Sequence, residues 1–184
     1  MTEHNHGAAI SGRESEKHFK NTLIDSAGVT FLKTVKEFQN YYGTEKGRRM
    51  YEETIKRPYP TDWGLLSSSK TKAGNVRNFI ADGYIPELNL ILELKFSKAH
   101  GTTEEKVMYD LVKISKGVYQ NSIGSRLLYI FHGPVCDKVA VYEQFEYEVS
   151  KQGLSSKVEV LNDNSSNLDK VVSYIKSLRE GGSR

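Results

Sequence analysis

Residues 81–96 of this 184-residue chain read ADGYIPELNLILELKF, and this stretch decides the fold. Side chains alternate between the two faces of a strand, so the even-numbered apolar residues share one face. We expect that face to be core; it carries Leu88, Leu90, Leu92, Leu94 and Phe96. Glu93 and Lys95 share the other face, about 6.7 Å apart by the strand rise. Charges in so apolar a run need an explanation.

A hairpin brings a third charge to the same face. A two-residue turn at Pro86–Glu87 predicts Ile85 opposite Leu88 and Asp82 opposite Ile91. Asp82 then lies diagonally across from Glu93, with Cβ atoms roughly 7–8 Å apart. The side chains of Asp82 and Glu93 can converge across that gap.

Two close carboxylates repel each other unless a cation lies between them. Lys95 offsets part of this repulsion, and a divalent ion does so better. Mg²⁺ takes hard oxygen ligands, often one or two carboxylates together with waters and substrate phosphates. The simpler interpretation of Glu93–Leu94–Lys95 alone is a solvent-facing strand with a Glu–Lys pair, since the pattern is short and common.

The spacing resembles a known motif. Asp82, ten intervening residues and then Glu93–Leu94–Lys95 is similar to the PD-(D/E)xK motif of restriction-endonuclease-like nucleases, with Ala81 in place of the proline. The resemblance implies that Asp82, Glu93 and the Leu94 carbonyl hold Mg²⁺, for which Mn²⁺ substitutes. It implies that Lys95 orients or helps deprotonate the attacking water and stabilises charge on the phosphate.

The same family often adds an acid from its first core helix, and this chain offers Glu14 and Glu16. Glu16 shares a helix face with Phe19 and Leu23, so it points toward the sheet. Its place on this face favours Glu16, which by the same resemblance would reach a second metal ion or its water. A plain role as helix-start acids, favoured by the helix dipole, remains open for both.

The remaining periodicity predicts one α/β domain over residues 1–184, with a mixed central sheet flanked by helices on both faces. Residues 1–12 and 180–184 are expected to be disordered ends. The expected strands are Arg77–Ile85, Leu88–Ser97, Arg126–Gly133 and Lys157–Asn162. The expected helices are Arg13–Ala27, Thr30–Tyr42, Arg48–Ile55, Gly101–Tyr119, Lys138–Gln152 and Asn167–Glu180.

Basic residues gather between the first helices and the hairpin. The segment from Tyr42 to Arg77 holds eight Lys or Arg residues against four acids, whereas the whole chain has a net charge of +3. Such a patch is typical of a phosphate-backbone binder, although a solvated loop face has the same composition. We interpret residues 43–78 as a DNA-recognition insertion. The candidate DNA contacts are Arg48, Arg49, Lys70, Lys72, Arg77, Lys98 and His100.

Composition limits the class of protein. Cys136 is the single cysteine, so no internal disulfide is expected, and no apolar run approaches the length of a signal peptide or membrane span. We therefore expect a cytoplasmic protein without a membrane partner. No nucleophile elbow, phosphate-binding glycine loop or dinucleotide fingerprint is present.

The resemblance to the PD-(D/E)xK family, together with the basic segment, implies a Mg²⁺-dependent endonuclease that cleaves double-stranded DNA. The first interpretation is a homodimeric, sequence-specific enzyme similar to type II restriction or homing endonucleases. A Holliday-junction resolvase or a DNA-repair nuclease of the same fold is the second. The non-enzymatic alternative is a DNA-binding module with a degenerate nuclease fold.

Overall fold

The structure, a computed structural model, describes residues 14–58, 78–96, 103–119 and 123–181. Its centre is a four-stranded sheet in the order β3-β4-β5-β6. The strands are β3 (Gly83–Ile85), β4 (Leu90–Phe96), β5 (Arg126–His132) and β6 (Val158–Asn162). β3 is antiparallel to β4, whereas β4, β5 and β6 are parallel to one another. This confirms a mixed central sheet.

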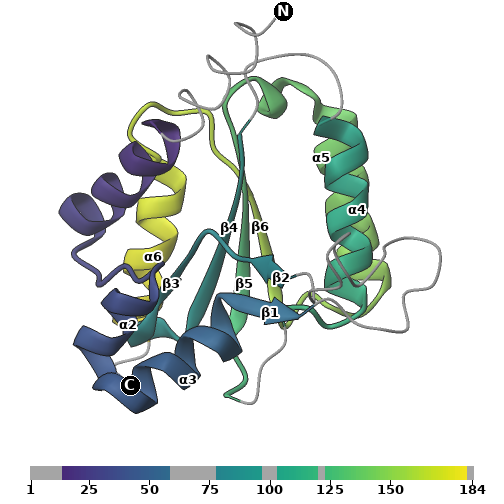
Figure 1. The fold of residues 1–184 in the computed structure, drawn as a ribbon. Coiled ribbons are helices and arrows are strands. Elements are labelled where there is room, and N and C mark those ends of the chain that lie inside the picture. The colour runs from purple at the N-terminus through teal and green to yellow at the C-terminus, as the bar shows by residue number, and fades with distance from the viewer. Residues whose placement is uncertain (1–13, 59–77, 97–102, 120–122, 182–184) are drawn as a thin grey trace, which may run out of the picture.

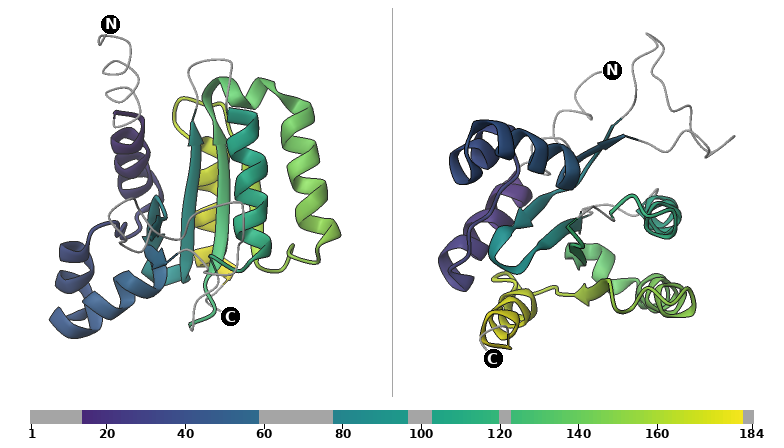
Figure 2. Two further views of the ribbon diagram at one scale, coloured as in Figure 1. Left: turned by 45° about the vertical axis from the view of Figure 1, so that its right-hand side comes forward. Right: turned by 90° about the horizontal axis from the view of Figure 1, so that it is seen from below.

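Helices cover both faces of the sheet (Figures 1 and 2). α4 (Thr103–Ser115) and α5 (Val139–Lys151) pack on one face, which they reach through crossovers between parallel strands. The helix over residues 14–22, its π-helical end η1 (Leu23–Ala27) and α6 (Asp169–Gly181) pack on the other. The architecture is therefore a three-layer α/β fold, as the sequence predicts.

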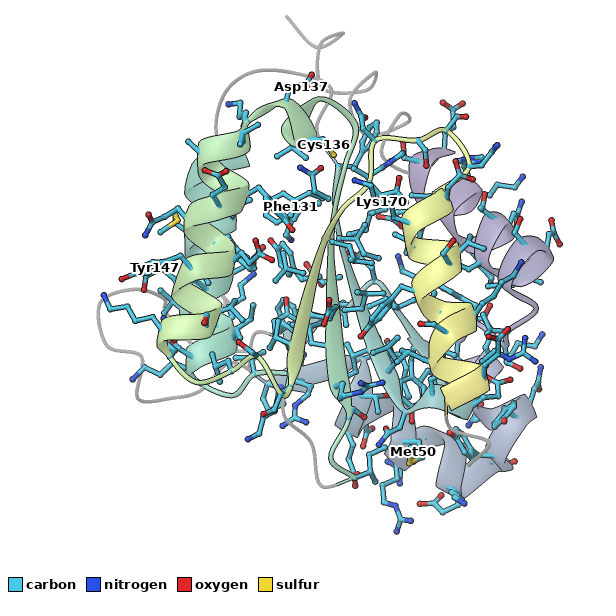
Figure 3. All side chains as sticks on the ribbon, turned by 180° about the vertical axis from the view of Figure 1, so that it is seen from behind. Met50, Phe131, Cys136, Asp137, Tyr147 and Lys170 are labelled. Carbon is cyan, nitrogen blue, oxygen red and sulfur yellow. The ribbon has the colours of Figure 1, made fainter. Side chains whose placement is uncertain are left out.

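Each face of the sheet has its own core. Phe131 points between the sheet and α5, whereas Tyr147 projects from the outer side of α5 (Figure 3). Ile91 belongs to the core under α4 and α5, and Leu92 belongs to the core under α6. β4 is thus buried on both sides, as parallel strands usually are. The expectation that only its even-numbered face is core was incomplete.

A smaller unit lies at the β3 edge. α2 (Val35–Tyr42) and α3 (Thr44–Thr54) lead into β1 (Lys56–Pro58), which pairs with β2 (Asn78–Ile80) in a separate two-stranded sheet. The predicted strand Arg77–Ile85 is therefore two strands with a bend at Asp82 between them. The chain pairs with β1 before this bend and with β4 after it, so Asp82 itself lies outside regular strand pairing.

The second helix begins later than predicted. Thr34 and Glu37 form a reciprocal capping box, which fixes the helix start at Val35. The preceding residues are extended, and Leu32 bridges Tyr84 at the free edge of β3. The predicted helix start at Thr30 is therefore wrong. The apolar spacing extends back to Phe31, but the capping box of Thr34 and Glu37 starts the helix four residues later.

The hairpin turn also differs from the prediction. Gly83 pairs with Leu92, and four residues separate β3 from β4, so the predicted pairing of Ile85 with Leu88 is wrong. Pro86 explains this result, because the tight two-residue hairpin turns need a positive φ at their first position and proline fixes φ near −65°. The turn is the 3₁₀ segment η3 (Pro86–Leu88) followed by Asn89 at φ 47°. The register shift is two residues, so the parity of the faces survives.

The other predicted elements are present with shifted ends: α3 begins at Thr44 rather than Arg48, and α4 ends at Ser115 rather than Tyr119. Gly28, at φ 63°, ends the first helix as expected. Leu168, Val171, Val172 and Ile175 are buried at the start and along the inner face of α6. α6 extends through Gly181, so two residues of the expected disordered end are helical. A short 3₁₀ segment, η4 (Gly133–Asp137), joins β5 to α5.

Candidate active site

Asp82 lies at the edge of the sheet, just before β3. Its backbone N–H donates to the Leu92 carbonyl at 3.1 Å, which holds the bend against β4. Its Oδ2 accepts a hydrogen bond from the Leu94 N–H at 2.8 Å. The carboxylate thus takes the place that a strand carbonyl would occupy. Asp82 itself lies in the bend just outside the regular β3–β4 ladder.

The Leu94 carbonyl points to the same edge. The N–H and C=O of one strand residue are directed toward the same neighbouring strand. Since the Leu94 N–H meets Asp82, the Leu94 carbonyl faces the gap beyond the start of β3. One carboxylate and one backbone oxygen therefore lie side by side there.

Glu93 and Lys95 project from β4 toward α4. Glu93 is only 4% exposed, and its Oε1 accepts from the Lys95 ammonium at 2.5 Å. The same ammonium lies 2.8 Å from Asp110 Oδ2. Lys95 is therefore clamped between two carboxylates of different elements, and its position is fixed.

Asp110, which the sequence pattern did not single out, joins this cluster from α4. It is 1% exposed on α4, and it also accepts hydrogen bonds from Lys113 at 2.6 Å and from the Tyr129 hydroxyl at 2.8 Å. A signal was present in the sequence: Asp110 follows Val107 by three residues and precedes Ile114 by four, so it shares their apolar helix face. A carboxylate at such a position has a buried partner.

One oxygen in this cluster has no partner. Glu93 Oε2 is buried, and no hydrogen-bond donor reaches it among the described residues. The Tyr119 hydroxyl is buried and unpartnered in the same part of the structure. A buried unpaired polar atom is unfavourable, so each of these marks a place where a bound group would be stabilising.

The electrostatics of the cluster agree with its geometry. Burial raises the pKa of Glu93 to about 8, with Asp82 and Asp110 adding to the rise and Lys95 opposing it. Burial also raises the pKa of Asp82, against the Leu94 N–H and the Lys95 ammonium. Burial lowers the pKa of Lys95, but Glu93 and Asp110 outweigh it and leave the pKa raised. Lys95 is therefore a firmly charged ammonium next to carboxylates that gain from a second cation.

Glu16 joins the site from the first helix. Its Oε2 lies 2.7 Å from the Lys33 ammonium, which also faces Asp82 Oδ1 at 3.9 Å. Phe19 and Leu23, on the same helix face, are buried against the sheet as the face argument requires. A cavity at the sheet edge is lined by Glu16, Lys33 and Asp82, whereas Glu14 is exposed and does not line it, so the geometry favours Glu16 over Glu14.

The structure thus brings together Asp82, Glu93, Leu94, Lys95 and Glu16. Arg48 and Arg49 lie apart from them on the exposed side of α3. Arg48 is paired with Glu45 at 2.7 Å and Glu52 at 3.5 Å, whereas no ion pair holds Arg49 within the described segments. The other candidate DNA contacts lie outside the described residues: Lys70, Lys72, Arg77, Lys98 and His100.

Among the residues described, no three His, Cys, Asp or Glu side chains form a ready-made metal cluster. None of the helices in the same residues has the length and apolar character to cross a bilayer. Neither family models, curated proteins nor solved structures give a significant match to this chain.

Proposed function

We propose that the protein is a Mg²⁺-dependent endodeoxyribonuclease that hydrolyses phosphodiester bonds in double-stranded DNA. One observation carries the proposal: the buried Glu93 Oε2 has no hydrogen-bond partner among the described residues. The Asp82 carboxylate is near enough to raise the pKa of Glu93, so the two acids repel each other. Buried carboxylate oxygens without donors are rare in folded proteins, and a divalent cation removes the conflict.

The donor set fits Mg²⁺. It consists of Asp82 Oδ1, Glu93 Oε2 and the Leu94 carbonyl, which are hard oxygen ligands. Asp82 Oδ1 faces Lys33 at 3.9 Å, beyond hydrogen-bond distance, so it retains capacity for a ligand bond. Mg²⁺ keeps several waters and needs few protein ligands, so a site without three clustered acids remains suitable, and Mn²⁺ accepts the same donors.

When bound, the metal ion would acidify a water and neutralise charge on the phosphate. The chain's own contribution is Lys95, whose ammonium is held by Glu93 and Asp110 at the same strand end. A fixed ammonium can orient the attacking water and stabilise the charge that develops on the phosphate. Asp110 acts through Lys95 and is a positioning residue.

The element order supports a nuclease of the PD-(D/E)xK type. A helix bearing Glu16 precedes the hairpin that carries Asp82 and Glu93, and α4 and the parallel strand β5 follow it. Within this type we favour a sequence-specific, homodimeric enzyme similar to type II restriction or homing endonucleases, acting in the cytoplasm. Arg49, exposed and outside any ion pair in the described part of the chain, supports DNA contact through α3. A Holliday-junction resolvase is the alternative substrate class.

A second candidate is a DNA-binding module without catalysis. The observation that favours it is the closed pairing of Lys95 with Glu93 and Asp110, which also suits a purely structural network. The unpaired Glu93 Oε2 argues against it, since a structural network would satisfy that oxygen.

The deciding experiment is cleavage of linear, supercoiled and branched DNA in Mg²⁺ by the wild type, Asp82→Asn and Glu93→Gln. We expect both variants to fall to the level of a no-enzyme control while Glu143→Gln, an exposed α5 control, keeps full activity. Ca²⁺ should support binding without cleavage, because it is a weaker acid toward its water. Discrete ends would indicate a sequence-specific enzyme, and cuts at branches alone a resolvase. Cleavage by both variants at the wild-type rate would refute the site.

A further inference from the structure

A cavity of about 250 Å³ lies between the first helix and the edge of the sheet, next to the candidate metal ligands. Five of its eight lining residues are charged, although most of the lining surface is apolar; the lining consists of Glu16, Lys17, Phe19, Lys20, Phe31, Lys33, Asp82 and Leu94. At about 30 Å³ per water, this space holds roughly eight waters. It is therefore large enough for an ion with a hydration shell.

Lys33 provides the cation between the two acids of this cavity. Its ammonium lies 2.7 Å from Glu16 and 3.9 Å from Asp82. All three side chains retain some exposure, 31% for Lys33, 49% for Glu16 and 22% for Asp82, so the group is reached by solvent and by ions. Two carboxylates of separate elements thus share one positive charge.

The backbone at Lys33 is held at both ends. The preceding residue, Leu32, exchanges two hydrogen bonds of 2.9 Å with Tyr84 of β3. The Lys33 N–H itself donates to Glu37 Oε2 at 2.8 Å, next to the capping box of α2. The side chain therefore starts from a fixed point, and removing its ammonium leaves these backbone contacts intact.

We propose that Lys33 fills the position that a second divalent ion would take between Glu16 and Asp82, so that the active site takes a single metal ion. Lys33 is on this view a positioning residue, which acts through Asp82. The inference rests on the proposed function, because it assumes that Asp82 and Glu93 bind the first ion.

Charge and geometry support this assignment. Glu16 and Asp82 offer carboxylate oxygens to the same space, which is the donor chemistry of a second Mg²⁺ site. A tethered ammonium neutralises one charge there and needs no uptake from solution. Its longer distance to Asp82 leaves Asp82 Oδ1 without a hydrogen bond from it, so this oxygen remains free to face the first ion.

The test is the number of Mn²⁺ ions bound per full-length chain, measured by titration calorimetry and by Mn²⁺ electron paramagnetic resonance without DNA. We expect one ion for the wild type and two for Lys33→Met and Lys33→Gln. Lys17→Met removes another lysine of the same cavity that no described ion pair holds, and it should bind one ion. The double variant Lys33→Met/Glu16→Gln should return to one.

The possible results separate the two hypotheses. One ion in the wild type and one in both Lys33 variants, with unchanged circular dichroism, would overturn the role of Lys33 and leave the proposed function standing. Two bound ions in the wild type would also overturn the role of Lys33 and leave the proposed function standing. No bound ion in any protein would overturn the proposed metal site, and the inference with it.

Discussion

Two charged clusters meet at β4, and they differ in burial. The α4-side cluster consists of Glu93, Lys95 and Asp110 and is closed off by α4. The edge cluster consists of Glu16, Lys33 and Asp82 and is open to solvent. Each places a lysine between two acids, and the α4-side cluster adds a second lysine, Lys113, on Asp110.

Burial gives the two clusters different properties. Removal from water makes each charge of the α4-side cluster dependent on its partners, which fixes positions and raises the pKa of Glu93. Solvent screens the more exposed Glu16–Lys33 pair of the edge cluster, so this pair contributes little to stability. Asp82 is the most buried member of that cluster, and burial raises its pKa. The proposed metal ligands come from both clusters, Asp82 from the edge cluster and Glu93 from the α4-side cluster.

The largest loss of stability is expected from a substitution in the α4-side cluster. Asp110→Ala removes the acceptor of Lys95, Lys113 and Tyr129 and should lower the free energy of unfolding by about 3–5 kcal/mol. The matched change in the edge cluster, Glu16→Gln, should cost less than about 1 kcal/mol. Urea denaturation at pH 7 measures both. Equal losses would show that burial does not separate the two clusters.

The pH dependence of stability should follow Glu93 in metal-free protein. Because its pKa rises from 4.5 to about 8 on folding, the folded state holds the extra proton between these values. The unfolding free energy should therefore fall as pH rises from 4.5 to 8. Glu93→Gln should remove this slope and leave a protein more stable than the wild type above pH 8. Unfolding curves in EDTA across this range test it, and an unchanged slope would contradict the shift.

Glu37, close to the edge cluster, should make the free energy of unfolding depend on pH in the opposite direction. Burial alone would raise its pKa, but hydrogen bonds from Lys20 and from the backbone N–H of Thr34 and Lys33 lower it to about 2. Its contribution is present above pH 4.5 and is lost as pH falls toward 2. Glu37→Gln should flatten the stability curve between pH 2 and 4.5 and leave the slope from 4.5 to 8 unchanged.

A smaller effect concerns the cap that anchors Lys33. Thr34→Ala should cost about 1 kcal/mol, because the Thr34 hydroxyl accepts from the Glu37 N–H at the start of α2. Thr44, at the start of α3, lies behind a glycine cap without a side-chain hydrogen bond, so Thr44→Ala is the control. Thermal unfolding of the two variants should separate them, and equal losses would refute the capping argument.

The smallest expected effect is on the salt dependence of DNA binding, after substitutions on the exposed side of α3. Arg49→Ala should reduce the slope of log affinity against log salt by about one unit, as loss of one phosphate contact does. Arg48 is already paired with Glu45 and Glu52, so Arg48→Ala should change the slope less. Binding to duplex DNA across a salt series measures both. Wild-type slopes in both variants would exclude α3 from the DNA interface.

The sequence by itself determined the elements and the motif. Periodicity within single windows predicted β4, β5, α5 and α6, because alternation and 3.6-residue spacing are local properties. The parity of one short hairpin brought Asp82 near Glu93, and the helix face of Glu16 followed from its spacing to Phe19. None of these needed contacts between distant segments.

Only the tertiary structure decided the register of the β3–β4 hairpin and the partners of each charged side chain. The Pro86 turn moved the hairpin by two residues, and the exchange of strand partners placed the Asp82 carboxylate at the sheet edge. Asp110 of α4 meets Lys95 of β4, and Lys33 meets Asp82, through packing between separate elements. Burial sets the strength of such contacts, and burial is a property of the assembled layers rather than of any stretch of sequence.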